Sequence, residues 1–148
     1  LWAPMSASDA QAVFAGYANN FEDFNVKKVL NAGVVRKMQK EVRDMDASEK
    51  LKDYITKIVD ATRDPKRYGI KSGRFIEWGG SPRANIAIYI GAKADAYLRG
   101  DKYVGPKNVR NVVKDALRHR IILNFLGQAE KVDTDKIISE IIDKVSVN

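Results

Sequence analysis

Apolar side chains recur every three or four residues along most of the chain, and this spacing predicts helices. Polar residues, glycines and prolines separate these segments and mark where each helix should begin or end. Five main helices joined by short loops indicate an all-α helical bundle with little room for a sheet. The expected helices cover residues 31–45, 46–63, 81–99, 105–117 and 134–145.

The segment 81–99 carries the clearest signals for the start and end of a helix. Ser81 can cap it, Pro82 suits its first turn, and Gly100 can end it. Because its first half is apolar nearly all round, we expect this helix to lie buried at the centre of the bundle. The apolar positions in that half are Ala84, Ile86, Ala87, Ile88, Tyr89, Ile90 and Ala92.

Loops and connectors occupy the remaining segments. Residues 65–80 contain four glycines and resemble a loop, within which residues 74–78 could form one short extended piece. Near the N-terminus, a capping-box pattern predicts a short helix over residues 8–18, and an Asn-rich connector follows over 19–31. Because the chain begins with Leu1 rather than methionine, we also expect it to be a fragment of a longer protein.

The composition excludes several kinds of site. The 148 residues include no cysteine, so disulfides, thiol nucleophiles and cysteine zinc sites are impossible, and one histidine is too few for a His-rich metal centre. We therefore predict no metal ligands in this chain. No stretch approaches the ~20 apolar residues of a membrane span, and no signal peptide pattern is present. These features favour a cytoplasmic protein that does not contact the membrane.

Positive charge is concentrated in the middle of the chain. The net charge is +7, yet residues 63–120 carry fourteen basic and five acidic side chains, a local net charge of +9. Such a centre is suited to an anionic partner, which could be a nucleotide, a nucleic acid or an acidic protein face. On charge alone, a solvated surface without a specific partner is the simpler interpretation.

Motifs of known catalytic chemistry are missing from the sequence. There is no phosphate-binding loop, no dinucleotide-binding glycine motif, no zinc-protease motif and no nucleophile elbow. His119 stands between two cations, Arg118 and Arg120. A polar role at a helix end is favoured over a general base there. We do not expect this chain to be catalytic by itself.

One short segment nevertheless points to an anion. In Gly79-Gly80-Ser81-Pro82-Arg83, a flexible glycine pair precedes a helix whose first turn contains an arginine. A cation is unfavourable near the positive end of the helix dipole unless it shares an anion, particularly a phosphate, with the helix end. From the pattern alone, the favoured alternative is an arginine that extends into solvent or pairs with Glu77.

The segment Gly-Gly-Ser-Pro-Arg-Ala at 79–84 closely resembles the Gly-Ala-Ser-Pro-Arg-Ala signature in the C-terminal lid of MoxR-type AAA+ ATPases. The resemblance extends over about residues 25–148, which we expect to be the helical lid domain, with residues 1–24 as the connector from an ATPase core. The other matching segments, in the family's order, are Asp53–Ile55, Ile58–Val59, Ala61–Arg63, Ala92–Ala94, Leu98–Gly100, Tyr103–Pro106, Val109–Arg110, Leu117–Ile121 and Ala129–Glu130.

This resemblance implies a role in ATP hydrolysis for the parent protein. The signature arginine, Arg83 here, would be the sensor 2 residue that reaches the terminal phosphates of ATP, with Ser81 and Pro82 beside the nucleotide. ATP and Mg²⁺ would be held through the core, which supplies the phosphate loop. Arg118 and Arg120 are secondary candidates for a nucleotide or inter-subunit contact. The family also implies a homo-oligomeric ring, expected to be a hexamer, and the remodelling of proteins with von Willebrand A domains.

The sequence departs from the family pattern at a few positions, and two other functions remain open. Gly80 replaces a usual alanine, which should loosen the turn, and Gly105 replaces the customary Ser or Thr cap. Lys107-Asn108 and 125–128 stand where the family is more acidic. The first alternative is a basic helical nucleic-acid-binding domain, although no recognition-helix motif supports it. The second is a scaffold for protein interactions.

Overall fold

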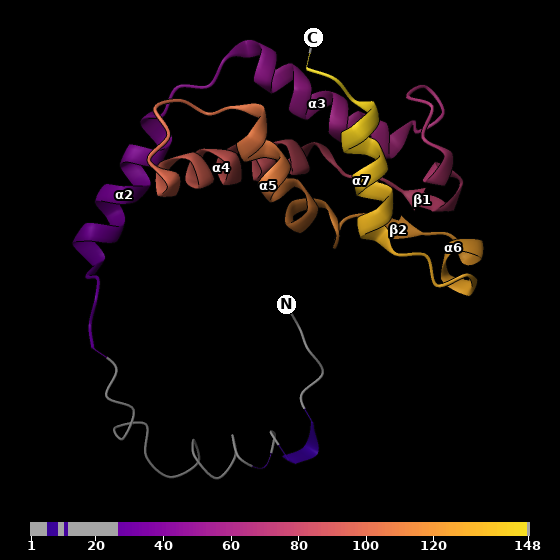
Figure 1. The fold of residues 1–148 in the computed structure, drawn as a ribbon, viewed down its shortest axis with the longest axis horizontal. Coiled ribbons are helices and arrows are strands. Elements are labelled where there is room, and N and C mark those ends of the chain that lie inside the picture. Colours follow the sequence, from indigo (N-terminus) through magenta and orange to yellow (C-terminus); the bar gives the residue numbers. More distant parts are fainter. Residues whose placement is uncertain (1–5, 9–10, 12–26, 148) are drawn as a thin grey trace. The chain divides into compact units, whose positions relative to one another are not determined.

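The computed structural model describes residues 6–8, 11 and 27–147, which fall into two units, Leu1–Val35 and Arg36–Asn148. The described elements follow one another as shown in Figure 1: α2 (Ala32–Asp44), α3 (Glu49–Arg63), the 3-10 helix η2 (Lys71–Phe75), β1 (Ile76–Trp78), α4 (Pro82–Arg99), α5 (Pro106–Leu117), β2 (Ile122–Leu123), α6 (Phe125–Ala129) and α7 (Thr134–Lys144). The mostly helical architecture and the five expected helices are confirmed. The helix expected over 8–18, the connector over 19–31 and the boundary after residue 24 lie largely outside the described residues.

Local side-chain bonds explain where the helices begin. The amide of Val34 donates to Asn31 Oδ1 (2.9 Å) at the start of α2, within the first unit. In the second unit, Ser48 caps α3 by accepting from the Leu51 amide (3.3 Å), and Asp133 caps α7. Each short polar side chain replaces a bond that the first turn of the helix cannot make internally.

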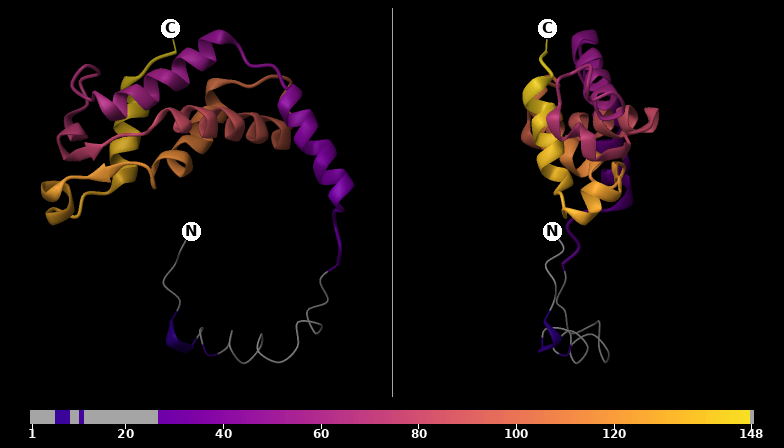
Figure 2. Two further views of the ribbon diagram at one scale, coloured as in Figure 1. Left: turned by 180° about the vertical axis from the view of Figure 1, so that it is seen from behind. Right: turned by 90° about the vertical axis from the view of Figure 1, so that its right-hand side faces the viewer.

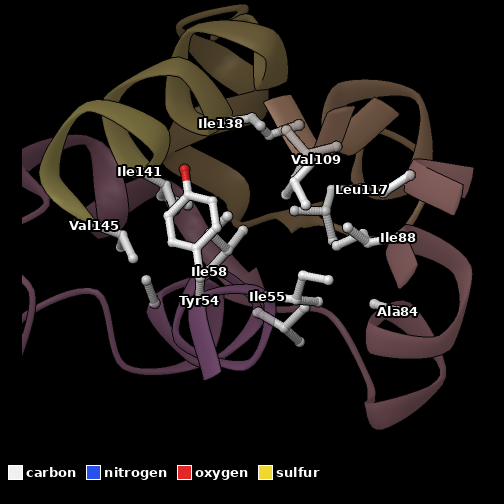
Figure 3. Packing of buried hydrophobic residues seen from close by; sticks show 14 of the residues in the cluster. Tyr54, Ile55, Ile58, Ala84, Ile88, Val109, Leu117, Ile138, Ile141 and Val145 are labelled. Atoms are coloured by element: carbon white, nitrogen blue, oxygen red, sulfur yellow. The ribbon is translucent and has the colours of Figure 1, made fainter. Parts of the chain in front are cut away.

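The core of the second unit lies between α3, α4, α5 and α7. In Figure 3, Ala84 and Ile88 of α4 point towards Ile55 and Leu117, and Tyr54 of α3 lies beside α7. These are the apolar faces that helical spacing predicts, and their burial is the main source of stability. The largest fully buried side chains are Tyr54, Ile55, Ile58, Thr62, Ile88, Val109, Val113, Leu117, Ile137, Ile138 and Ile141.

The expectation that α4 is buried all round is wrong. Ile86 and Ile90 keep 60% and 55% of their surface exposed, whereas the opposite side of the helix is buried. The physical reason is the layering: α4 packs against α3 and α5, while α7 packs on α3 and α5 instead of covering the far side of α4. The apolar residues of α4 therefore form one face that packs in the core and a second face that this unit leaves exposed.

A small antiparallel sheet and α6 lie together at one end of the second unit (Figure 2). β1 pairs with β2 in the register Ile76–Leu123 and Trp78–Ile122. The extended piece expected within 74–78 is confirmed for its last three residues. The sequence pattern does not predict β2 and α6, because segments of two and five residues are too short to show a period.

Polar contacts tie distant elements of this unit together. Lys93 Nζ of α4 donates to the carbonyl oxygen of Arg43 in α2 (2.7 Å). The Glu140 carboxylate of α7 accepts from the amides of Lys71 (2.7 Å) and Ser72 (3.0 Å), which fixes η2 against α7. Among the described residues, no helix is long and apolar enough to cross a membrane.

Candidate functional site

The glycine pair before α4 is held firmly against the end of α3. The Gly80 amide donates to Thr62 Oγ1 (2.8 Å), and the Thr62 hydroxyl donates to the Val59 carbonyl oxygen (2.6 Å). A Cβ atom at Gly79 would stand only 2.3 Å from the Thr62 carbonyl oxygen. The expectation of a flexible, loosened turn is therefore wrong, because these glycines permit a close approach of two backbone segments.

The first turn of α4 begins at Ser81, as the sequence predicts. Ser81 has extended backbone angles (φ −77°, ψ 168°), Pro82 is the first helical residue, and the Ala84 amide donates to the Ser81 carbonyl oxygen (2.8 Å). The Ser81 side chain makes no capping bond, and the first turn contains no acidic residue. The positive end of this helix dipole thus lacks a carboxylate of its own.

Arg83 is the second residue of α4, and its side chain is exposed together with those of Ser81 and Pro82. In residues 27–147, no ion pair or hydrogen bond joins the Arg83 guanidinium to Glu77, which is also exposed. One of the two simpler alternatives, pairing with Glu77, is therefore not found. The structure brings the three predicted residues together as a cationic helix start that faces solvent.

Arg118 at the end of α5 is engaged within the chain. Its Nε and Nη2 atoms donate to the two Asp135 oxygens (2.7 Å each), and Nη1 donates to Asp115 (3.1 Å). The hydrogen bond to Asp135 raises the pKa of Arg118, and the same bond lowers the pKa of Asp135. This bidentate ion pair between Arg118 and Asp135 joins the end of α5 to the start of α7.

Arg120 lies beside His119, and its Nη1 atom contacts His119 Nε2. The Arg120 amide donates to the Leu117 carbonyl oxygen (2.8 Å), so the backbone continues the last turn of α5. The hydrogen-bond partners of the two secondary candidates lie at the end of α5 and the start of α7.

Sequence reasoning missed two polar residues that position helix starts, Thr62 and Asn108. Both are buried, and each accepts a hydrogen bond from a glycine amide before a helix: Gly80 for Thr62, and Gly105 for Asn108 (2.8 Å). Asn108 thereby makes one half of a capping box, in which the third helical residue accepts from the amide of the capping position; the other half would need a Ser or Thr side chain at residue 105. A single polar residue on an otherwise apolar helical face was the available signal.

Acidic side chains do not gather into a metal centre in the part of the chain described. No group of three or more His, Cys, Asp or Glu residues there could hold an ion. The first turn of α4, which contains Arg83, has no acidic residue of its own.

Comparison with known proteins shows which proteins this chain resembles. A model of the AAA lid domain family matches residues 72–141. Chaperone MoxR1 of Mycobacterium tuberculosis is 30% identical over 122 residues, which are 82% of this chain and 32% of that protein. Protein MoxR of Paracoccus denitrificans is 31% identical over 102 residues, which are 66% of this chain and 29% of that protein.

A solved structure supports the same likeness in three dimensions. The crystal structure of a proposed ATPase from Cytophaga hutchinsonii matches with a TM-score of 0.81 and 33% identity, covering 98% of this chain and 44% of that one. The chain spans about a third of the length of the curated relatives it matches.

Proposed function

Because this chain belongs to the MoxR-type AAA+ ATPases and is their C-terminal lid domain, we propose that it is the nucleotide-sensing part of a larger ATP hydrolase. In this proposal Arg83 is the sensor 2 residue. The observation that supports it most directly is the exposed cation at the start of α4, which has no carboxylate partner among the described residues. The family resemblance, in which an arginine stands at this position of the signature, supports the same residue.

Bound ATP with Mg²⁺ would supply the transferable phosphoryl group, and the ATPase core would hold both. An exposed arginine at a helix N-terminus fits such an anion, because the guanidinium and the positive end of α4 act on the same oxygens. Arg83 would donate hydrogen bonds to the phosphate and stabilise the charge that develops on it during transfer. The Thr62–Gly80 bond keeps the start of α4 in place, so Arg83 approaches the phosphate from a fixed base.

The wider setting of this function is also part of the proposal. The lid would act with its own ATPase core, in a homo-oligomeric ring expected to be a hexamer. The assembly would remodel partner proteins in the cytoplasm, and the family favours partners with von Willebrand A domains. Arg118 and Arg120 remain secondary candidates, with Arg118 needing to leave Asp135 before it could bind a phosphate with the same atoms.

Replacing Arg83 in the protein that carries this lid tests the proposal. We expect Arg83→Ala to lower ATP turnover about 100-fold, the usual loss when one preorganised donor to the transition state is removed. Arg83→Lys should recover only part of that loss, because lysine keeps the charge but lacks the two-pronged geometry. The melting temperature should stay within about 2 °C, since the side chain is exposed.

Lys107 provides a matched control. It is exposed and is the second residue of α5, directly after Pro106, just as Arg83 follows Pro82. Lys107→Ala should leave turnover unchanged. If Arg83→Ala also leaves turnover unchanged, the sensor role is excluded; if both variants lose activity equally, general surface charge rather than a sensor is responsible.

A further inference from the structure

Three side chains of α4 form a stripe along the side that meets the end of α2. Tyr89, Lys93 and Tyr97 follow one another at intervals of four residues, so they lie on one side of the helix. Within the second unit, Lys93 Nζ donates to the Arg43 carbonyl oxygen (2.7 Å), and the Tyr97 hydroxyl donates to Glu41 Oε2 (2.5 Å). The Lys93 ammonium also lies 5.0 Å from the centre of the Tyr89 ring. The two hydrogen bonds, with the four residues that make them, are called the clasp below.

Lys93 is the unusual member of the clasp. Only 9% of its surface is exposed, yet its ammonium has no carboxylate partner within residues 27–147. Its acceptor lies in the last turn of α2, where the carbonyl groups have no amide donor inside the helix and carry the negative end of the helix dipole. Lys93 therefore caps the end of α2 from another helix. Because burying a cation is costly, the bond to α2 is what a lysine adds at this position.

The last turns of α2 have no buried side chain that could hold them in the core. The close packing of α4 is with α5 and α3, and long side chains of α4 reach α2 instead. An ammonium, a phenol and a carboxylate can all be hydrated when they separate, whereas separating two apolar surfaces exposes both to water. A contact made of such polar groups can therefore open and close at a low cost in free energy.

We propose that the clasp is a releasable attachment that fixes Arg83 relative to the chain entering the lid through α2, with Lys93 as its positioning residue. The inference rests on the proposed function, in which an ATPase core precedes this chain and holds the nucleotide. α4 is one continuous helix from Pro82 to Arg99, and Lys93 lies about 15 Å from Arg83 along its axis. Lys93 is thus too far away to bind the same phosphate, and it acts only through the helix.

A closed clasp makes α2 and α4 move as one body. The start of α4 is already fixed on α3 by the bond from the Gly80 amide to Thr62, so closing the clasp joins the end of α2 to that body. Arg83 then reaches the phosphate from a constant distance, and a small displacement of a catalytic group lowers the rate strongly. With the clasp open, α2 can turn away from α4, and this constant distance is lost.

Hydrogen exchange in the full-length protein tests whether the clasp holds α2. Lys93→Met removes the charge and the donor but keeps a long side chain, and Tyr97→Phe removes one hydroxyl. We expect the amides of residues 37–44 to exchange about tenfold faster in Lys93→Met and about threefold faster in Tyr97→Phe. Tyr89→Phe is the matched control, because the Tyr89 hydroxyl makes neither clasp bond, and exchange should not change. Unchanged exchange in Lys93→Met would overturn the proposal.

ATP turnover by the same variants tests the link to Arg83. Lys93→Met should lower kcat about tenfold and leave the KM for ATP within about twofold, because the clasp acts on the position of Arg83 in the transition state. Lys93→Arg should recover part of kcat, since a guanidinium can donate to the same carbonyl oxygen. In an Arg83→Ala background, Lys93→Met should cause no further loss. Faster exchange with unchanged kcat, or equal losses with and without Arg83, would overturn the positioning role.

The two proposals can fail separately. If Arg83→Ala lowers turnover but Lys93→Met changes neither turnover nor exchange, the sensor role stands and the clasp is wrong. If Arg83→Ala is fully active while Lys93→Met speeds exchange in α2, the sensor role is wrong and the clasp only attaches α2.

Discussion

The starts of α4 and α5 share a sequence pattern but differ in their surroundings. Each helix has a proline as its first residue and an exposed cation as its second, with no acid in the first turn. At α5, the Gly105 amide donates to Asn108, whose own amide group donates to Asp95 (2.9 Å) and Asp101 (2.8 Å). At α4, the corresponding bond from Gly80 reaches the neutral hydroxyl of Thr62.

This difference assigns the two helix starts to different roles. Carboxylates of the chain itself stand close to the positive end of α5, so that end is compensated internally. The described residues supply no such carboxylate to the start of α4, which is therefore the end that can accept a negative charge from outside. A proline followed by a cation is accordingly a weak signal for an anion site. Whether such a helix start can bind an anion depends on whether carboxylates of the chain already lie beside it.

The glycines before the two helices should differ most in their tolerance of a side chain. A Cβ at Gly79 would clash with the backbone of Thr62, whereas a Cβ at Gly105 would meet only Asn108 Oδ1 at 3.7 Å. We expect Gly79→Ala to destabilise the protein by about 3 kcal/mol, and Gly105→Ala by less than about 1 kcal/mol. Urea unfolding of both variants measures the difference. If both variants lose the same unfolding free energy, the backbone near Thr62 can shift at little cost to accommodate the added methyl group.

Removing the two polar anchors should have the next largest effect. Asn108→Ala should cost about 2 kcal/mol, because it leaves the Gly105 amide without that bond and deprives Asp95 and Asp101 of a donor. Thr62→Val removes the bond from the Gly80 amide and the bond to the Val59 carbonyl oxygen, and should cost about 1 kcal/mol. Denaturant unfolding at neutral pH gives both values. A larger loss for Thr62→Val would reverse the order that internal compensation predicts.

Acid should weaken the α5 start before it affects the α4 start. Burial raises the pKa of Asp95, but hydrogen bonds from Asn108, Asn111 and Arg99 outweigh burial, so its pKa is lowered below 3.8. A carboxyl with a lowered pKa stabilises the fold above its unfolded pKa of about 3.9, and that contribution is lost as the pH falls through the folded pKa.

The measurement is the unfolding free energy between pH 7 and pH 2. Asp95→Asn should reduce stability at neutral pH and flatten the decline below about pH 4. Thr62→Val has no titrating group and should leave the shape of that decline unchanged. If the stability of Asp95→Asn falls below pH 4 as steeply as that of the unaltered protein, Asp135 and Glu140 cause most of the acid destabilisation, because their pKa values are also lowered.

The contrast between the helix starts also shows what the sequence could predict. Helical spacing located all five helices, and the motif at 79–84, through its family resemblance, made Arg83 the candidate that the experiments above test. Thr62 acts on Gly80, 18 residues away, and Asn108 bonds to Asp95 across 13 residues, so local pattern does not predict these two partners. The bond from the Gly105 amide to Asn108 spans only three residues and follows a local capping pattern. The exposed side of α4 was wrongly expected to be buried because composition cannot tell which elements cover a helix.

The smallest predicted change is also the one that separates stability from function. Ser81→Asp would place a carboxylate at the start of α4, where the present side chain makes no capping bond. This should stabilise the lid by about 0.5 kcal/mol, because an acid suits the positive end of a helix. The same carboxylate would compete with phosphate for Arg83 and should weaken ATP binding. Gly105→Asp at α5 is the control, since an added acid there should change stability without changing ATP affinity. Stronger ATP binding by Ser81→Asp would show that the start of α4 is not an anion site.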